Sequence, residues 1–206
     1  GSVVGASRQP AININAGNVA SALTSAGPDF FAYINQGTTA FNVKVTGAIS
    51  LVKGGGGALT LNPGTGVSND YTGGTFVDGG TLNLNGAAGT IVIPGDLTIN
   101  NSTVTMSNAN KFNATTGQIA AASNVTLNGG SLLNFFNYTT ATTTTLASLT
   151  FNNTGGNSQP RVLFNTPTAL HTLVLTAANA ITVVNDDFAT TPIIQDAWRR
   201  GQAVAI

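Results

Sequence analysis

Short segments in which apolar residues alternate with small polar ones recur along this chain at a nearly constant spacing. The segment at 59–62 (LTLN) returns as LNLN at 82–85, an offset of 82 − 59 = 23. The segment at 125–128 (VTLN) returns as LTFN at 149–152, an offset of 149 − 125 = 24. Alternation with a period of two predicts β-strands, and a repeat of roughly 20–30 residues is typical of a solenoid in which each repeat forms one coil. The pattern therefore predicts an all-β fold, a parallel β-helix with one chain forming every coil. A β-sandwich is the alternative that many short strands leave open.

Stacked coils would align equivalent side chains in columns along the helix axis. Position 173 follows position 149 by the same offset (173 − 149 = 24), so two inward-facing columns are predicted from three coils. Their members are Val125, Leu149 and Leu173 in one column, and Leu127, Phe151 and Leu175 in the other. Asn128 and Asn152 follow two of these strands. They are expected to stack at the turn and to pass side-chain amide hydrogen bonds from coil to coil.

The fit to the period divides the chain into three parts. Residues 1–50 fit it less well and are predicted to form an N-terminal capping or less regular β segment, because an open coil end exposes strand edges. Residues 51–186 are predicted to form the β-helix rungs, and residues 187–206 a C-terminal cap or tail. The shorter offset from Leu82 to Leu97 (97 − 82 = 15) breaks the period. This break indicates either a short coil or two strands that are not equivalent.

The C-terminal part contains the one segment whose pattern suggests a helix, at 193–200 (IIQDAWRR). Ile193, Ile194 and Trp198 are expected to cover the last coil. The apolar end at 203–206 and the opening Gly-Ser suggest a piece of a larger protein. The expected partners are therefore the rest of a parent chain or other copies of this chain.

Charged side chains are scarce, at 7% of residues against roughly 25% in an ordinary soluble domain, and Glu is absent. Nucleic acid is not an expected partner, because neutralising phosphates requires clustered Lys and Arg. No run of 18 apolar residues occurs, so insertion into a membrane is not expected either. The absence of Cys is consistent with the cytosol, but a chain without Cys that is rich in Thr, Asn and Gly also suits export from a bacterium and exposure on its surface.

Candidate catalytic and ligand-binding groups are few and scattered. Lys53 precedes a run of glycines and a predicted strand, whereas a phosphate-binding loop places its Lys after the glycines and before a helix. We therefore interpret this run as a corner. Asp70, Asp78 and Asp96 would have to converge in one groove to act on a glycan. His171 is the only histidine and, without Cys or Glu, does not indicate a zinc site or a triad. No catalytic residue, cofactor or metal site is predicted.

The stretch at 69–86, NDYTGGTFVDGGTLNLNG, joins these strand and turn signals in one motif. It resembles the passenger-associated transport repeat, also called the autotransporter-associated β-strand repeat. The matching residues are Asn69, Tyr71, Thr72, Gly73, Gly74, Thr75, Gly79, Gly80, Thr81, Leu82 and Leu84. The resemblance implies a right-handed parallel β-helix and an extracellular or outer-surface location on a bacterium. It implies no catalytic residues, because the family shares none.

The residue types within this motif suggest individual roles. Gly73-Gly74 and Gly79-Gly80 are interpreted as tight corners, and Phe76, Leu82 and Leu84 as core positions. Tyr71 is expected to pack its ring over a corner while its hydroxyl reaches solvent.

These observations predict a non-enzymatic structural or adhesive module of a secreted or surface-exposed bacterial protein, with host or matrix glycans as possible partners. Self-assembly into a filament through end-to-end contacts is the alternative. A glycan-active enzyme is the third hypothesis, and it requires a cluster of at least three Asp in one groove.

Overall fold

The computed structural model describes residues 2–5, 12–15, 21–87, 89–107, 118–136, 141–153, 159–165, 171–184 and 193–196. These residues form twenty β-strands and no helix. The pairings between these strands are all parallel. Parallel pairing throughout excludes the β-sandwich alternative, because sandwiches are built from antiparallel sheets.

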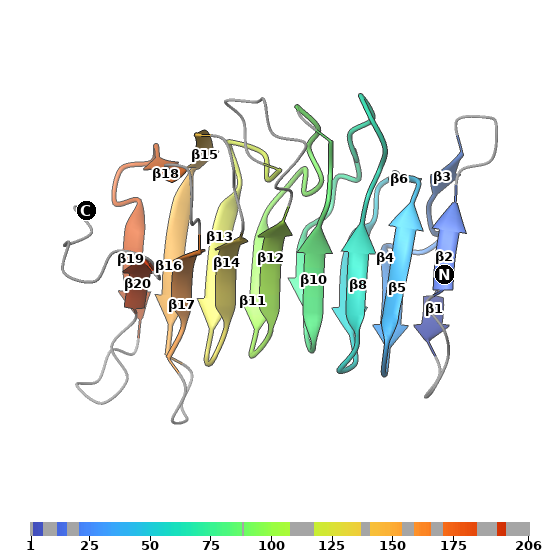
Figure 1. Ribbon diagram of the computed structural model, residues 1–206, viewed down its shortest axis with the longest axis horizontal. Coiled ribbons are helices and arrows are strands. Elements are labelled where there is room, and N and C mark those ends of the chain that lie inside the picture. The colour runs from blue at the N-terminus through green and yellow to red at the C-terminus, as the bar shows by residue number, and fades with distance from the viewer. Residues whose placement is uncertain are drawn as a thin grey trace.

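Two sheets of eight strands each run the length of the molecule (Figure 1). The first sheet contains, in order, β1 (Ser2–Gly5), β4 (Asp29–Ile34), β7 (Ser50–Gly54), β9 (Thr75–Val77), β11 (Leu97–Asn100), β13 (Asn124–Asn128), β16 (Ser148–Asn152) and β19 (Ile181–Val184). The second sheet contains β2 (Ile12–Asn15), β5 (Thr38–Asn42), β8 (Ala58–Leu61), β10 (Thr81–Leu84), β12 (Thr103–Ser107), β14 (Leu132–Phe136), β17 (Arg161–Asn165) and β20 (Ile193–Asp196).

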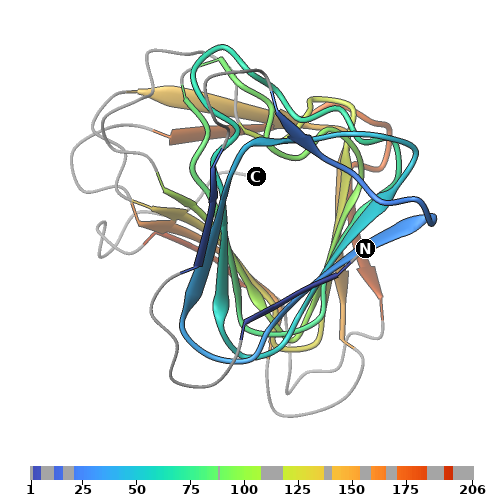
Figure 2. The same ribbon diagram turned by 90° about the vertical axis from the view of Figure 1, so that its right-hand side faces the viewer.

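A third side closes each coil and is less regular. Its strands are β3 (Ala22–Leu23) paired with β6 (Lys44–Val45), and β15 (Thr142–Leu146) paired with β18 (His171–Leu175). The chain visits the first sheet, the second sheet and the third side in turn, then starts the next coil. Figure 2, viewed along the long axis, shows successive coils superposed around one interior. The fold is therefore a parallel β-helix of eight coils.

Alternation along each strand places every second side chain in the interior. In the first sheet one inward column contains Leu51, Thr75, Leu97, Val125 and Leu149, all fully buried. Burying a Val or Leu side chain contributes about 1.5–3 kcal/mol, so each column holds its coils together by packing as well as by backbone hydrogen bonds.

Four of the six residues predicted for the inward columns lie as two aligned pairs. Val125 of β13 lies beside Leu149 of β16, and Leu127 lies beside Phe151. All four side chains are buried.

The prediction that Leu173 and Leu175 continue these two columns is wrong, although both side chains pack against the core. Both residues lie in β18 on the third side, where Leu173 aligns with Thr144 and Leu175 with Leu146. The first-sheet strand that follows β16 is β19, in which Ile181 aligns with Leu149 at the larger offset of 181 − 149 = 32. The third-side strand has the same alternation of apolar and polar residues. Counting 24 residues on from Leu149 therefore reaches Leu173, which lies in a strand on a different side of the coil.

Strand pairing continues across the boundary predicted at residue 51. β4 pairs with β7, and β5 pairs with β8, so the first two coils continue the same two sheets. The period was missed there because the coil from Asp29 to Ser50 is short, with a register offset of 50 − 29 = 21. The short offset from Leu82 to Leu97 has a different explanation, since Leu82 lies in the second sheet and Leu97 in the first.

The helix predicted at 193–200 is not formed by the residues that the structure describes there. Ile193–Asp196 is strand β20, which pairs with β17 and extends the second sheet. Ile194 packs against the core. Trp198 and the rest of the predicted C-terminal cap or tail beyond 196 lie outside the described residues, as do 187–192. Within the described part of the chain there is no helix long and apolar enough to cross a membrane.

Candidate functional site

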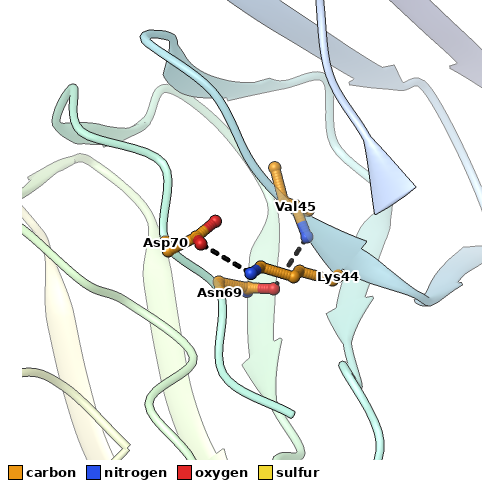
Figure 3. A network of polar contacts seen from close by, with 4 residues as sticks. All are labelled: Lys44, Val45, Asn69 and Asp70. Atoms are coloured by element: carbon orange, nitrogen blue, oxygen red, sulfur yellow. Dashed lines mark hydrogen bonds and ion pairs between the residues drawn. The ribbon is translucent and has the colours of Figure 1, made fainter. Parts of the chain in front are cut away.

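The motif at 69–84 begins on the third side of one coil and continues into the next coil. There it forms β9 of the first sheet and β10 of the second sheet. Asn69 is buried on the third side and connects three coils. Figure 3 shows its contact with Val45. Its Oδ1 accepts a hydrogen bond from the backbone N–H of Val45 in the preceding coil at 2.8 Å. Its Nδ2 donates to the carbonyl of Val92 in the following coil at 2.7 Å. The side-chain amide therefore continues the hydrogen-bond ladder where the third side has no regular strand.

Asp70 is the exposed neighbour of this joint. Figure 3 shows its ion pair with Lys44. The carboxylate oxygen lies 2.5 Å from the Lys44 ammonium nitrogen. The hydrogen bond from Lys44 lowers the pKa of Asp70 below its ordinary value. An ion pair this exposed contributes little to stability. The joint between the coils is therefore stabilised mainly by the buried Asn69 and not by Asp70.

Tyr71 is buried rather than laid over a corner with its hydroxyl in solvent, so that prediction is wrong. The side chain is 1% exposed, and its hydroxyl bonds to Thr75 Oγ1 at 2.6 Å. Burial raises the pKa of the Tyr71 phenol well above its ordinary value. The hydroxyl partner of Tyr71 therefore belongs to the same motif, since Thr75 is the first residue of β9.

Phe76 points outward and is 37% exposed, so its predicted core position is wrong as well. Its neighbours Thr75 and Val77 are fully buried, which leaves Phe76 on the outer face of β9. Leu82 and Leu84 are fully buried in β10, and Thr81 precedes them in the same strand.

Gly73 and Gly80 of the motif lie at places where coils approach too closely for a side chain. A Cβ added to Gly73 would lie 2.6 Å from the Ile49 carbonyl oxygen. A Cβ on Gly80 would lie 2.3 Å from the Gly57 oxygen, and Gly80 also has a φ of +64°. Thr72 donates its backbone N–H to the Gly47 carbonyl at 3.0 Å, which aligns this turn with the coil before it. Gly74 and Gly79 belong to the same two turns.

Lys53 is the functional feature that sequence reasoning missed. Its side chain is fully buried inside the coil. Lys53 lies near the end of β7, just before the glycine-rich corner. Nζ donates to three backbone carbonyls, those of Gly55 and Gly57 at 2.6 Å and that of Gly79 at 2.5 Å. Burial lowers the pKa of Lys53 to about 8. The signal was present in the alternation, since Lys53 is the next inward position after Leu51.

Side-chain ladders join the coils on the outside. In the first sheet Asn128 Nδ2 donates to Asn100 Oδ1 at 2.6 Å, and Asn100 Nδ2 donates to Asp78 Oδ1 at 2.6 Å. Asn152 aligns with Asn128 in the next coil. The polar turn residues therefore stack in register along the axis.

The second sheet has a ladder of the same kind. Asn42 Nδ2 donates to Asn15 Oδ1 at 2.7 Å, and Asn62 Nδ2 donates to Asn42 Oδ1 at 3.0 Å. This ladder was not predicted, although each of the three residues follows or ends a strand of the second sheet.

The carboxylates that a glycan-active enzyme would need do not gather. Asp78 lies just beyond the C-terminal end of β9, whereas Asp96 lies just before β11, at the opposite end of the first-sheet strands. Asp96 Oδ1 accepts from the backbone and side chain of Asn124 at 2.8 and 3.1 Å. Asp70 lies on the third side with Lys44. Among the described residues no group of three or more His, Cys, Asp or Glu could hold a metal ion.

His171 points into the core near the C-terminal end. Its ring centroid lies 4.4 Å from that of Phe135 and 5.7 Å from that of Phe164. Burial lowers the pKa of His171 to about 4. At neutral pH it is therefore a neutral member of an aromatic cluster.

The outer face of the first sheet carries an apolar strip toward the N-terminal end. Phe31, Val52 and Phe76 align across three successive strands, and Tyr33 is the next outward position after Phe31. We call these four residues the aromatic strip. Phe31 is 49% exposed and Tyr33 is 50% exposed.

The same outward column continues as threonine through the remaining strands of the first sheet. Its members are Thr98, Thr126, Thr150 and Thr182. The outer face therefore changes from aromatic to hydroxyl-bearing along the axis.

Two protein-family models match the chain. Residues 51–84 match the Passenger-associated-transport-repeat model, and residues 92–185 match the Haemagglutinin repeat model. The first match contains the motif described above, and the second spans the coils that follow it. Together they support a repeat protein of the autotransporter or two-partner-secretion type. No curated protein and no solved structure is significantly similar to the chain.

Proposed function

We propose that this autotransporter-like repeat protein is a rigid, non-enzymatic structural and adhesive module of a secreted or surface-exposed bacterial protein. The haemagglutinin and transport repeats suggest the coarser part of this statement, an adhesin-like structural module at or beyond the cell surface. The rigidity, the absence of catalysis and the adhesive use of the outer faces are our proposal.

The observation that carries the proposal is the unbroken parallel pairing across eight coils in two sheets. Seven steps of about 4.8 Å separate the first strand of a sheet from the eighth, which gives a span of about 34 Å. Every step is held by two strand ladders, buried columns hold the central coils together, and asparagine ladders reinforce several steps. Such a body resists bending and keeps whatever it presents at a fixed distance from its anchor.

A structural role also agrees with the polar groups in the described residues. The side chains that would suggest chemistry each stabilise a joint between coils: Asn69 through two backbone groups, and Lys53 through three carbonyls. Asp78 and Asp96 each accept a hydrogen bond from an asparagine of the next coil. The glycan-active hypothesis lacks the shared groove of carboxylates that it requires.

Surface display tests the proposal directly. The chain is placed between a membrane anchor and an epitope on a heterologous bacterium, and the anchor with the epitope alone is the control. We expect the epitope to become accessible to a bulky antibody and the cells to attach more strongly to at least one surface among glass, polysaccharide films and epithelial layers. Unchanged epitope access together with unchanged attachment to every surface would contradict the proposal.

A specific observation favours self-assembly as the second candidate function. Ile181 and Val183 of β19 align with the buried Leu149 and Phe151, yet they are 36% and 43% exposed. A second copy stacked on this coil would cover both side chains and extend the first sheet, and repeated stacking would give a filament. Light scattering across a concentration series distinguishes the two functions. Mass that grows with concentration in the chain, and not in a Val183→Lys variant, supports the filament, and a constant monomer mass contradicts it.

A further inference from the structure

We infer that the aromatic strip on the outer face of the first sheet binds a neutral, hydroxyl-rich polysaccharide that lies along the β-helix axis. This inference rests on the proposed adhesive function and names the chemistry of its partner. The strip consists of Phe31, Tyr33, Val52 and Phe76, on the neighbouring strands β4, β7 and β9 of three coils.

The spacing of the rings suits a sugar chain. Phe31 and Phe76 are two coil steps apart in one outward column, with Val52 between them, which places them about 10 Å apart along the axis. This distance is close to the repeat of an extended β-linked disaccharide. Each ring could therefore stack against the apolar face of a sugar at equivalent positions of the polymer.

Tyr33 adds a second ring beside this column. It aligns with Gly54, and a Cβ on Gly54 would lie 3.0 Å from Cδ2 of the Tyr33 ring. The absence of a side chain on Gly54 therefore lets the ring extend over the neighbouring coil. A half-exposed tyrosine offers both an apolar face and a hydroxyl that can bond to sugar hydroxyl groups.

The charge on this face selects for a neutral partner. In the described strands of the first sheet, Lys53 is the sole cationic residue, and it is buried inside the coil. Asp29 lies at one end of the strip, and Asp78 lies beyond β9 at the other. An anionic polymer would meet carboxylates and no exposed cation on these strands, whereas a neutral glycan meets no repulsion.

Beyond Phe76 the threonine column extends the same face. Thr98, Thr126 and Thr150 present hydroxyl groups at one position per coil. A polymer that follows the axis can therefore pass from ring stacking to hydrogen bonding without leaving the sheet. A small, compact ligand would contact only the aromatic strip or only the threonines, so the length of this surface favours a polymer.

Sedimentation of the purified chain with insoluble cellulose and chitin tests the inference, with heparin beads as the anionic comparison. The test variant is Phe31→Thr/Phe76→Thr, which extends the natural threonine column. The matched control is Phe136→Thr, because Phe136 is 40% exposed but belongs to β14 of the second sheet. Circular dichroism and the thermal midpoint confirm that both variants are folded.

The expected result is binding to at least one neutral polysaccharide that weakens about tenfold or more in the double variant and persists in Phe136→Thr. Raising the salt concentration should leave this binding unchanged. Three results would overturn the inference: no binding to either neutral polymer, equal binding by the double variant, or stronger binding to heparin. Self-association that the double variant abolishes would also overturn it, by assigning the strip to a second copy. Failure here with continued attachment to other surfaces in the display experiment would leave the proposed function standing.

Discussion

Acidification should destabilise this protein through its single histidine. His171 is 9% exposed and packs its ring among Phe135 and Phe164 near the last coils. Burial lowers the pKa of His171 from an ordinary value of 6.5 to about 4. The folded chain therefore keeps the imidazole neutral over a range in which the unfolded chain would protonate it.

The size of the effect follows from the two pKa values. They differ by about 2.5, and each unit corresponds to about 1.4 kcal/mol, so complete protonation costs the folded state about 3 kcal/mol. Because the folded pKa is the lower one, the unfolded state binds the proton first as pH falls. The contribution of His171 to the free energy of unfolding should be level above about pH 7, should fall between pH 6.5 and 4, and should level off below that window.

Urea unfolding at pH 7.5 and at pH 4 measures this loss, and His171→Phe is the control because a phenyl ring suits the same cluster. Every other residue is the same in both proteins, so the difference between the two losses isolates the histidine. We expect the wild type to lose about 3 kcal/mol more than the variant. NMR of the wild-type imidazole provides an independent check, since the chain has one histidine. Equal losses in both proteins, or an imidazole that titrates near pH 6.5, would refute the reasoning.

Two further substitutions test the joints between coils. Lys53→Met should lower the free energy of unfolding by about 3 kcal/mol or more, because three carbonyls lose the buried ammonium that they bind. Lys44→Met breaks only an exposed ion pair and should lower the free energy of unfolding far less. If urea unfolding gave similar losses of stability for both variants, the role of Lys53 would be contradicted. Gly80→Ala should lower the thermal midpoint more than Gly64→Ala does. Both glycines have a positive φ, but only the Cβ of Gly80 would meet a carbonyl oxygen, while the space around Gly64 is open. Equal midpoints would contradict the close approach of the coils at Gly80.

The β-helix could be predicted because its period appears directly in the residues. The spacing between Val125 and Leu149 is the length of one coil, and alternation identifies which of their neighbours face inward. The glycine pairs and Asn69 carried the resemblance to the transport repeat, and each lies at a contact between coils. Period, alternation and turn residues are local signals, so sequence alone was sufficient for the fold.

The assignment of strands to sides was less predictable, because it depends on loops of unequal length. Leu173 has the same pattern as a first-sheet strand, but the coil around it is longer, with a register offset of 181 − 149 = 32. No local property distinguishes a third-side strand from a first-sheet strand. Only the pairing of whole coils does so.

The outer face and the interior polar residues were mispredicted for a different reason. Phe76 was assigned to the core because it is aromatic, although Thr75 and Val77 hold the inward positions. Lys53 was considered only as the residue before a glycine-rich corner, although its place in the alternation is inward. In both cases position along the strand determined the side, and residue type was the weaker guide.

The central claim is that the coils are stacked in register as one rigid body, and a distance between two spin labels tests it most directly. The chain contains no cysteine, so Ala40→Cys/Leu163→Cys would carry its two labels without competing thiols. Both positions belong to one outward column of the second sheet, five coil steps apart. Pulsed electron paramagnetic resonance should therefore give a single narrow distribution near about 24 Å, before allowance for the label arms. A broad distribution, or a main distance far from this value, would contradict the stacked β-helix.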